Sequence, residues 1–373
     1  MGQTIGVKEI EYLAIGAAVL GTGGGGDPYI GKLMAQKAIE ECGPVTLLAP
    51  DEVPDDALVV PTAMMGAPTV FFEKIPNGDE ALHSLRRLEE YLGKKAFAVM
   101  PMECGGLNST IPFVVAARSG LPLVDADGMG RAFPELQMET FNVYGVSGTP
   151  MVITDERGNW CLVNTVDNHL LEYIARGITI RMGGVGHIAE YPMTGKEMKE
   201  TSIHYTTTLA INIGKAIVHA RERLENPLEG MGKALAESNY GEPLVLFEGK
   251  IIDVDRRTVE GFTRGTVTLE GLGTDAGSHF KVEFQNENLI AYRNDEVVAT
   301  VPDLITFLDL ETYKPITTEG LRYGYRTICI GIPTPPIMRT TEALEIWGPK
   351  YFGYDLPFIP VEELAKNVKR GRS

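Results

Sequence analysis

The sequence lacks a long hydrophobic run, a pair of closely spaced cysteines and a cluster of basic residues. No apolar stretch approaches the roughly 20 residues that span a bilayer, and the first residues lead into a charged segment unlike a secretion signal. The four cysteines are far apart, which is typical of reduced thiols in the cytosol. The formal charge of −16 repels phosphate backbones and anionic membranes. We therefore expect a cytoplasmic protein that binds neither nucleic acid nor a membrane.

The chain has enough apolar sequence to build two cores. Its 373 residues are 44% hydrophobic and 23% charged, the profile of a globular protein with two domains. In the first half, short apolar runs alternate with helical patterns, which predicts βαβ units and a mainly parallel sheet. The predicted strands are 45–48, 57–60, 96–100 and 121–124, and the predicted helices are 7–20, 80–92 and 112–118.

The pattern changes near residue 166. A helix at 168–176 is followed by a long helix that begins at Thr194, whose capping box includes Glu197. Six short strands between 243 and 300 then predict an antiparallel barrel or sandwich module. The sequence therefore predicts an α/β protein with an N-terminal mainly parallel βαβ domain at 1–166 and a β-rich C-terminal domain at 167–373.

The most prominent motif is a glycine-rich loop at 21–28, with the sequence GTGGGGDP. It has the spacing of a dinucleotide-binding fingerprint, but a helical pattern precedes it and no Lys-Ser/Thr pair follows it. Successive glycines allow positive φ angles and close approach of the backbone to a ligand, and the next helix begins with free amides. We expect the loop to bind substrate, with a plain tight turn and a nucleotide site as the alternatives. The expected binding residues are Gly23, Gly24, Gly25, Gly26 and Asp27.

Polar residues follow two of the predicted strands, at the end where parallel sheets bind ligands. Asp125 and Asp127 come after strand 121–124, and their spacing would point both to one side of an extended chain. Such a pair suits metal binding or acid–base chemistry; an Asx turn with a helix cap is the alternative. After strand 96–100 come an acid, a thiol and an amide, and a buried inert thiol is the alternative there. These three residues are Glu103, Cys104 and Asn108.

The six histidines show no zinc-binding spacing such as HExxH. His187 is the best candidate for a metal ligand, because the glycine-rich piece 183–186 precedes it and can present it to a site. His169 and His204 come next. A structural role is the alternative for each of them.

Taken together, these segments resemble the S-methyl-thiohydantoin desulfurase family, whose members are similar to proteins encoded beside hydantoinases and oxoprolinases. The matching motifs are LGTGGGGDP at 20–28, MGAP at 65–68, Glu103 with GGLN at 105–108, and VDADGMGRAFPE at 124–135. The order of an α/β half and a β-rich half agrees as well, so the resemblance covers nearly the whole chain. It implies a hydrolase that acts on a small hydantoin-like cyclic amide and releases a thiol or sulfide.

We expect this hydrolase to depend on a divalent metal, with zinc as the expected ion. Asp125, Asp127 and His187 would hold the metal, with one aspartate as general base, and a metal-activated water would attack the ring carbon that carries sulfur. Arg131 would bind a substrate carboxylate, and amides of the glycine loop would bind a ring oxygen.

Three other interpretations stay open. A metal-free hydrolase would use Cys104 as nucleophile, with Glu103 or a histidine as base. A non-catalytic subunit of a hydantoinase-type assembly would bind ligand without turnover. A nucleotide-dependent enzyme would use the glycine loop. Long helices and a proline-rich tail favour a homo-oligomer in each case.

Overall fold

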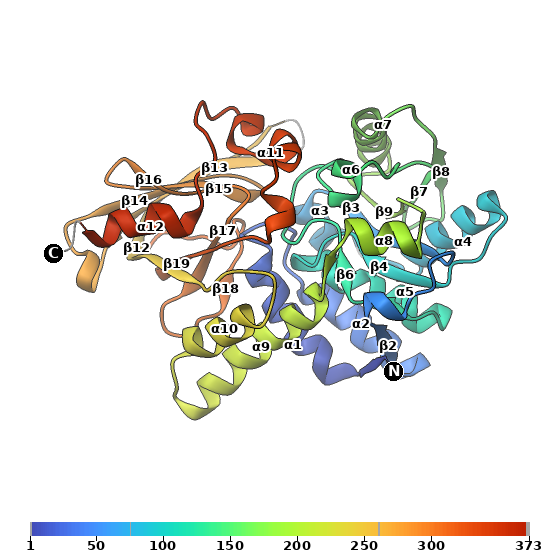
Figure 1. Cartoon of the computed structure of the whole chain (residues 1–373), viewed down its shortest axis with the longest axis horizontal. Helices are drawn as coiled ribbons and strands as arrows, with labels where there is room; N and C mark the ends of the chain where they lie inside the picture. The colour runs from blue at the N-terminus through green and yellow to red at the C-terminus, as the bar shows by residue number, and fades with distance from the viewer. Residues whose placement is uncertain (1, 75, 260–261, 371–373) are drawn as a thin grey trace.

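The structure, a computed structural model of the chain, describes residues 2–74, 76–259 and 262–370. A first sheet with helices around it and a second, antiparallel sheet lie side by side, and the two ends of the chain lie at opposite sides of the molecule (Figure 1). This arrangement confirms the predicted α/β fold with a β-rich C-terminal part.

The helices and strands have the following bounds. The α-helices are α1 (Val7–Leu20), α2 (Tyr29–Cys42), α3 (Pro68–Glu73), α4 (Glu80–Leu92), α5 (Ile111–Ser119), α6 (Thr140–Val143), α7 (Asn168–Arg181), α8 (Gly195–Thr201), α9 (Thr206–Arg223), α10 (Pro227–Ala236), α11 (Thr341–Trp347) and α12 (Val361–Arg370). The 3₁₀ helices are η1 (Pro50–Glu52), η2 (Gly106–Ser109), η3 (Gly273–Asp275), η4 (Pro336–Met338) and η5 (Pro349–Phe352). The strands are β1 (Gln3–Ile5), β2 (Val45–Leu48), β3 (Leu58–Gly66), β4 (Ala98–Pro101), β5 (Leu123–Val124), β6 (Ala126–Asp127), β7 (Met151–Thr154), β8 (Trp160–Val163), β9 (Val185–Ala189), β10 (Met193–Thr194), β11 (Ile203–His204), β12 (Leu244–Val259), β13 (Phe262–Gly271), β14 (His279–Gln285), β15 (Glu287–Arg293), β16 (Glu296–Thr300), β17 (Leu304–Asp309), β18 (Pro315–Ile316) and β19 (Arg326–Ile332).

The first sheet has the strand order β1-β2-β5-β4-β3-β9-β7-β8, with β10 paired to β3. Strands β2, β5, β4 and β3 are parallel, as the alternating pattern predicts, whereas the flanking strands pair antiparallel. Neighbouring residues of the central strands point to opposite faces. Val60 and Val99 belong to the core beneath α4 and α5, while Val59 and Met100 belong to a separate core with Met198 of α8. Strands β9 and β10 come after residue 166, so this sheet draws on both halves of the sequence.

The second sheet has the order β16-β15-β14-β13-β12-β19-β17-β18, and every pair is antiparallel among the residues described. Its core includes stacked rings of Phe247 and Phe280, with centroids 4.8 Å apart. Two of the six predicted strands, at 244–247 and 250–254, are one long strand, β12, because Gly249 lies opposite Gly271 within the ladder and not in a turn. A Cβ at Gly249 would lie 2.7 Å from the Phe247 ring, so packing requires the glycine there.

The predicted long helix from Thr194 was wrong in its length. The capping box at Thr194 and Glu197 is present, but α8 ends at Thr201 and α9 begins at Thr206. Between them β11 pairs with β6, and Tyr205 adopts a φ of +64°. Backbone groups that pair with a distant strand are not available for a continuous helix, which explains the break. Predicted helices 7–20 and 80–92 match α1 and α4.

Over the described part of the chain, no helix combines the length and the apolar character that crossing a membrane requires.

Candidate active site

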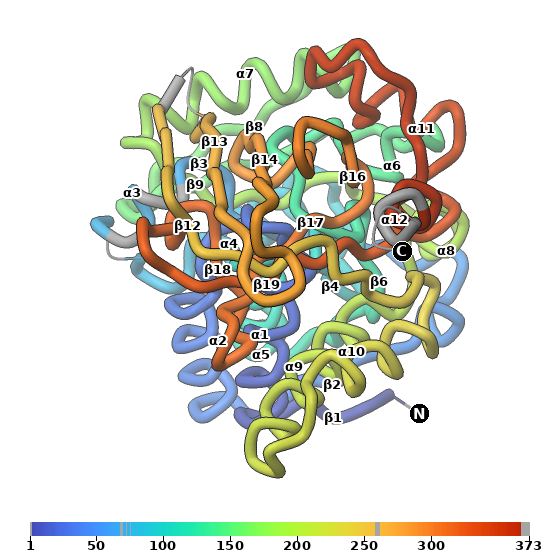
Figure 2. Tube along the Cα trace, turned by 90° about the vertical axis from the view of Figure 1, so that its left-hand side faces the viewer, coloured from blue at the N-terminus to red at the C-terminus, as the bar shows by residue number. Residues whose placement is uncertain are grey.

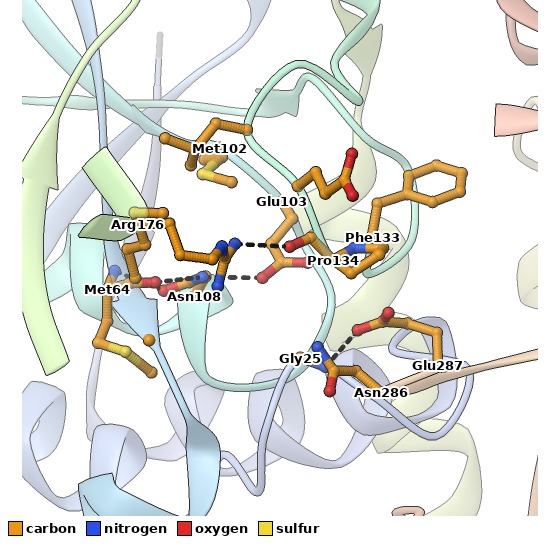
Figure 3. Close-up of a pocket in the computed structure, with 14 residues that line it drawn as sticks. Gly25, Met64, Met102, Glu103, Asn108, Phe133, Pro134, Arg176, Asn286 and Glu287 are labelled. Carbon is orange, nitrogen blue, oxygen red and sulfur yellow. Dashed lines mark hydrogen bonds between the residues drawn. The ribbon is translucent and has the colours of Figure 1, made fainter. Parts of the chain in front are cut away.

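A cavity lies at the carboxyl ends of β3 and β4, where residues from the second sheet complete its wall (Figure 3). This is the edge of the parallel strands at which α/β proteins bind ligands. One part of the lining is apolar and rich in methionine, and the other part carries acids and amides. The lining residues are Gly25, Met64, Met65, Gly66, Met102, Glu103, Asn108, Phe133, Pro134, Glu135, Leu136, Arg176, Asn286 and Glu287.

The glycine-rich loop contributes Gly25 to the cavity wall, and it packs so closely there that side chains would not fit. A Cβ at Gly24 would lie 2.1 Å from Oε1 of Glu287, and a Cβ at Gly25 would lie 2.5 Å from the carbonyl oxygen of Gly105. Gly25 also has a φ of +69°, which favours glycine. Its amide donates to Oε1 of Glu287 at 3.3 Å, and its carbonyl accepts from the amide of Leu107 at 2.9 Å. The loop therefore packs directly against the polar residues of the cavity.

Of the loop residues predicted to bind substrate, Gly25 lines the cavity and Gly24 packs against Glu287. The carbonyl of Gly23 accepts from the amide of Thr318 at 2.7 Å, which ties the loop to the second sheet. Asp27 caps the start of α2 by accepting from the amide of Tyr29 at 2.9 Å, and Gly26 has a φ of +74° in the turn before it.

Glu103 and Asn108 form the polar centre of the cavity wall. The amide nitrogen of Asn108 donates to Oε1 of Glu103 at 2.8 Å and to the carbonyl of Met64 at 3.1 Å. Its carbonyl oxygen accepts from the amide of Met64 at 2.7 Å. Oε2 of Glu103 has no hydrogen-bond partner within the described residues. Glu103 is thus held through one oxygen, and its other oxygen is buried next to the backbone of Phe133.

The two cavity carboxyl groups favour their protonated forms. Burial raises the pKa of Glu103 well above its usual range, the hydrogen bond from Asn108 opposes the shift, and the charge of Glu287 adds to it. Burial also raises the pKa of Glu287 to about 8, against the opposing charge of Arg131. Oε2 of Glu287 likewise lacks a partner among the described residues. A neutral carboxylic acid can donate a proton, and a carboxylate with a pKa near 8 is a strong enough base to accept one.

Asp125 and Asp127 do not line this cavity, judged on the residues described. Asp125 accepts from the amide of Thr208 at 3.0 Å and so caps the first turn of α9. Asp127 accepts from the amides of Cys104 at 2.6 Å and Gly130 at 3.0 Å, and burial raises its pKa to about 7. Asp127 thereby fixes the residue next to Glu103. Roles for the two aspartates in metal binding or as general base stay predictions.

His187 lies in β9, away from the two aspartates. It pairs with Met64 of β3 in the sheet, its ring centroid is 6.3 Å from that of Phe71, and the charges of Glu80, Lys74 and Glu156 act on it. Burial lowers its pKa. His169 lies on the outer side of α7, and His204 hydrogen-bonds to the carbonyl of Lys199.

Within residues 2–74, 76–259 and 262–370, no group of three or more His, Cys, Asp and Glu side chains is arranged to hold a metal ion. The residues predicted as zinc ligands are not brought together, so they do not fit a zinc site in this arrangement. Zinc stays a prediction of the sequence.

Cys104 and Arg131 are both fully buried. The thiol of Cys104 donates to the carbonyl of Thr206 at 3.4 Å, and burial raises its pKa well above the usual value. The guanidinium of Arg131 donates to backbone carbonyls of both parts of the chain, and burial lowers its pKa to about 10. The accepting carbonyls belong to Ala132, Asn288, Pro302 and Asp303, at 3.0–3.2 Å. Arg131 thus joins the loop after β6 to the second sheet, and its role as a carboxylate ligand stays a prediction.

Comparison with known proteins shows which protein family the chain belongs to. The N-terminal domain model of the S-Me-THD-like family matches residues 8–165, and its C-terminal domain model matches residues 166–361. The chain belongs to the S-Me-THD-like family. No curated protein matches the chain. A crystal structure of a protein from Chromobacterium violaceum is similar, with a TM-score of 0.80 and 26% identity over 96% of this chain and 100% of that chain.

The motifs that carry the resemblance to the S-methyl-thiohydantoin desulfurase family surround the cavity. Gly25, the residues 65–66, Glu103, Asn108 and the residues 133–135 all line it, although they come from four separate segments. The S-Me-THD-like motifs thus meet at one place, at the ends of two neighbouring parallel strands.

Sequence reasoning missed several cavity residues. Asn286 lies in the turn between β14 and β15, and Glu287 is the first residue of β15. Both lie far along the chain from the other motifs, and no pattern indicated that this turn reaches the first sheet. Met64, Met65 and Met102 lie in the segments that follow predicted strands 57–60 and 96–100, so the strand pattern places them at the same edge of the sheet as Glu103. Buried carboxyl groups of Glu139 and Glu190 were also missed, and burial raises both pKa values well above the usual range.

Proposed function

We propose that this S-Me-THD-like protein is a hydrolase that converts an S-methyl-thiohydantoin into the corresponding hydantoin and releases methanethiol. The family supplies the substrate class. The observation that carries the proposal is the pair of buried carboxyl groups, Glu103 and Glu287, which line one cavity and each have one oxygen without a hydrogen bond among the described residues. Such a pair can supply the proton donor and the proton acceptor that hydrolysis of a thioimidate carbon needs.

The apolar part of the cavity suits the methylthio group. Met64, Met65 and Met102 lie close to the two acids, with Phe133 and Leu136 nearby. Thioethers are polarizable and adapt to a ligand of irregular shape, so they favour contact with a sulfur-bearing carbon over contact with a charged group. The methionine side of the cavity would contact the methylthio leaving group. The side that carries Asn108 and Asn286 would face the polar atoms of the substrate ring.

In the proposed reaction, Glu103 in its neutral form donates its proton to the ring nitrogen beside the sulfur-bearing carbon. The ionised form of Glu287 takes a proton from water, and the water oxygen forms a bond to that carbon. The tetrahedral intermediate then expels methanethiolate as the carbon–sulfur bond breaks, and the proton held by Glu287 returns to the thiolate. The hydroxyl proton of the former water passes to the ionised Glu103 and restores its neutral form, while the ring nitrogen keeps its proton and the carbon keeps the water oxygen as a carbonyl. The products are one hydantoin and one methanethiol per water.

The neighbouring residues would hold these groups in place. Asn108 fixes Glu103 relative to Met64 at the end of β3, and Gly25 donates to Glu287 from the glycine loop. Asp127 fixes the amide of Cys104 next to Glu103. These contacts support the proposal because acid–base catalysis depends on donors and acceptors held within a few tenths of an ångström.

Turnover of S-methyl-thiohydantoin in ¹⁸O-labelled water tests the proposal. A thiol-reactive dye measures methanethiol, and mass spectrometry measures the hydantoin. We expect equal amounts of thiol and hydantoin, with one ¹⁸O atom in the new carbonyl. Ring-opened product without thiol would contradict desulfuration, and tight substrate binding without turnover would favour the non-catalytic binding subunit.

A further inference from the structure

Helix α7 presents an apolar stripe to solvent along its whole length. Four large side chains on its outer side are exposed: Leu170 by 38%, Tyr173 by 78%, Ile174 by 38% and Ile180 by 60%. The opposite side of the helix packs against the first sheet through Leu171, Ala175 and Thr179. α7 lies at an edge of the molecule in both views (Figure 1, Figure 2). A surface helix normally carries polar residues on its outer side, so a stripe of this kind marks an interaction site.

The stripe has a small residue near its centre. Gly177 lies between Tyr173 and Ile180 on the same side of the helix, and a Cβ placed there would meet no atom within 4 Å. Glycine weakens a helix interior by about 1 kcal/mol relative to alanine. Packing within this chain does not require the glycine at 177. A close approach by another helix would.

We propose that α7 pairs with α7 of a second copy of this chain, antiparallel and about a two-fold axis that crosses the helix near residue 175. This register places Leu170 against the partner subunit's Ile180, and Tyr173 against the partner subunit's Gly177. Two-fold symmetry makes each contact occur twice, and each large side chain meets a small or apolar one. The stripe is therefore complementary to itself in the antiparallel direction.

The charges at the two ends of the helix favour the same arrangement. Asp167 caps the start of α7 by accepting from the amide of Leu170, and Arg181 lies in its last turn; both are exposed. An antiparallel pair brings Asp167 close to the partner subunit's Arg181, whereas a parallel pair would bring like charges together. The helix dipoles favour the antiparallel pair as well.

The cation nearest the axis does not oppose this pairing. Arg176 pairs with Glu172, donates to the carbonyl of Pro134 and lies over the ring of Phe262, so its charge has partners within the chain. Arg176 and Glu135 line both the candidate active site and the groove along α7. The dimer interface would therefore lie beside the mouth of the cavity, although the inference does not depend on the proposed reaction.

Sedimentation equilibrium of the full chain tests the inference. We expect a dimer of twice 40.7 kDa, and we expect Tyr173→Glu to weaken association at least about 30-fold, because a buried aromatic residue at an interface centre contributes that much. Tyr91→Glu is the matched control: Tyr91 is a helix residue of α4 exposed by 55%, and its change should leave the dimer intact. Thermal unfolding monitors folding of both variants.

A cross-link gives a second readout. In a Cys42→Ser background, which removes the exposed thiol, Ile174→Cys lies near the proposed axis and should form a disulfide-linked dimer under mild oxidation. Tyr91→Cys in the same background should not. A monomeric wild-type chain, a dimer that tolerates Tyr173→Glu, or equal cross-linking of the two cysteine variants would overturn the inference.

Discussion

The side-chain amide of Asn108 donates a hydrogen bond of 2.8 Å to Oε1 of Glu103, and the same side chain holds both backbone polar groups of Met64. This contact joins the end of β3 to the first residues after β4. It fixes the position of Glu103 and opposes part of the rise in its pKa that burial causes. The proposed acid is thus placed by an amide that has no charge of its own.

Asn108→Ala should lower kcat by about 100-fold, because misplacing an acid by about 1 Å has an effect of that size. It should also lower the free energy of unfolding by about 1–3 kcal/mol, since buried polar groups lose their partners. Steady-state kinetics and thermal unfolding measure the two effects. Asn168→Ala is the control, because Asn168 is also buried and bonds to the amide of Gly148, and neither residue lines the cavity. Equal losses of kcat per folded molecule in both variants would contradict the positioning role.

The value of kcat/KM should rise with pH and level off above a pKa of about 8. Burial raises the pKa of Glu287 to about 8, so the group is mostly protonated at neutral pH and becomes a base only as the pH rises. Glu287→Gln should remove this rising limb and lower the rate by about 10²- to 10⁴-fold. Glu283→Gln, on the neighbouring strand and paired with Lys281, should leave the profile unchanged. A wild-type profile that is flat through pH 8, or a Glu287→Gln profile that keeps the limb, speaks against Glu287 as the base.

Gly24→Ala should lower the activity of the protein without unfolding it. The added methyl group would lie 2.1 Å from Oε1 of Glu287, so that side chain must move. We expect kcat to fall about 10- to 100-fold, as for other misplaced catalytic groups. Gly232→Ala in α10 is the control, because its methyl group would meet only Pro243 at 3.8 Å. Activity of Gly24→Ala at the level of the control would show that the loop does not position Glu287.

Alkylation should leave the activity intact. Cys104 is fully buried, and burial raises the pKa of its thiol well above the usual value, so it is a poor nucleophile. Iodoacetamide should modify the exposed Cys42 first, without loss of turnover. Cys104→Ala should keep most of the activity per folded molecule and lose about 1 kcal/mol of stability. Complete inactivation of Cys104→Ala in a folded protein would favour the cysteine-dependent mechanism.

Local patterns were sufficient to predict much of the fold. The apolar spacing of α1 and α4 and the capping box at Thr194 depend on residues within a few turns of one another, and each is present. The break at residues 202–205 depends on pairing between β11 and β6, about 75 residues apart, and the continuity of β12 depends on Gly271 opposite Gly249. A helical or alternating pattern alone holds no information about such distant partners.

The residues of the candidate site also fall into two groups, those that local patterns predict and those that depend on distant parts of the chain. Gly25, Glu103 and Asn108 follow elements whose ends could be predicted, and the cavity brings them together. Asp125 and Asp127 have the same kind of sequence position, yet they accept hydrogen bonds from α9 and from the loop at Cys104, because α9 packs behind that strand end. Glu287 was missed because it reaches the cavity from the second sheet, and only the docking of the two sheets brings it there.

The most direct test of the account is single-turnover release of methanethiol by wild-type protein and by Glu103→Gln. The amide has nearly the same shape as the neutral acid but cannot donate the proton. We expect Glu103→Gln to bind S-methyl-thiohydantoin with unchanged affinity and to release thiol about 10²- to 10⁴-fold more slowly. Thiol release at the wild-type rate would contradict the role of Glu103 as the acid.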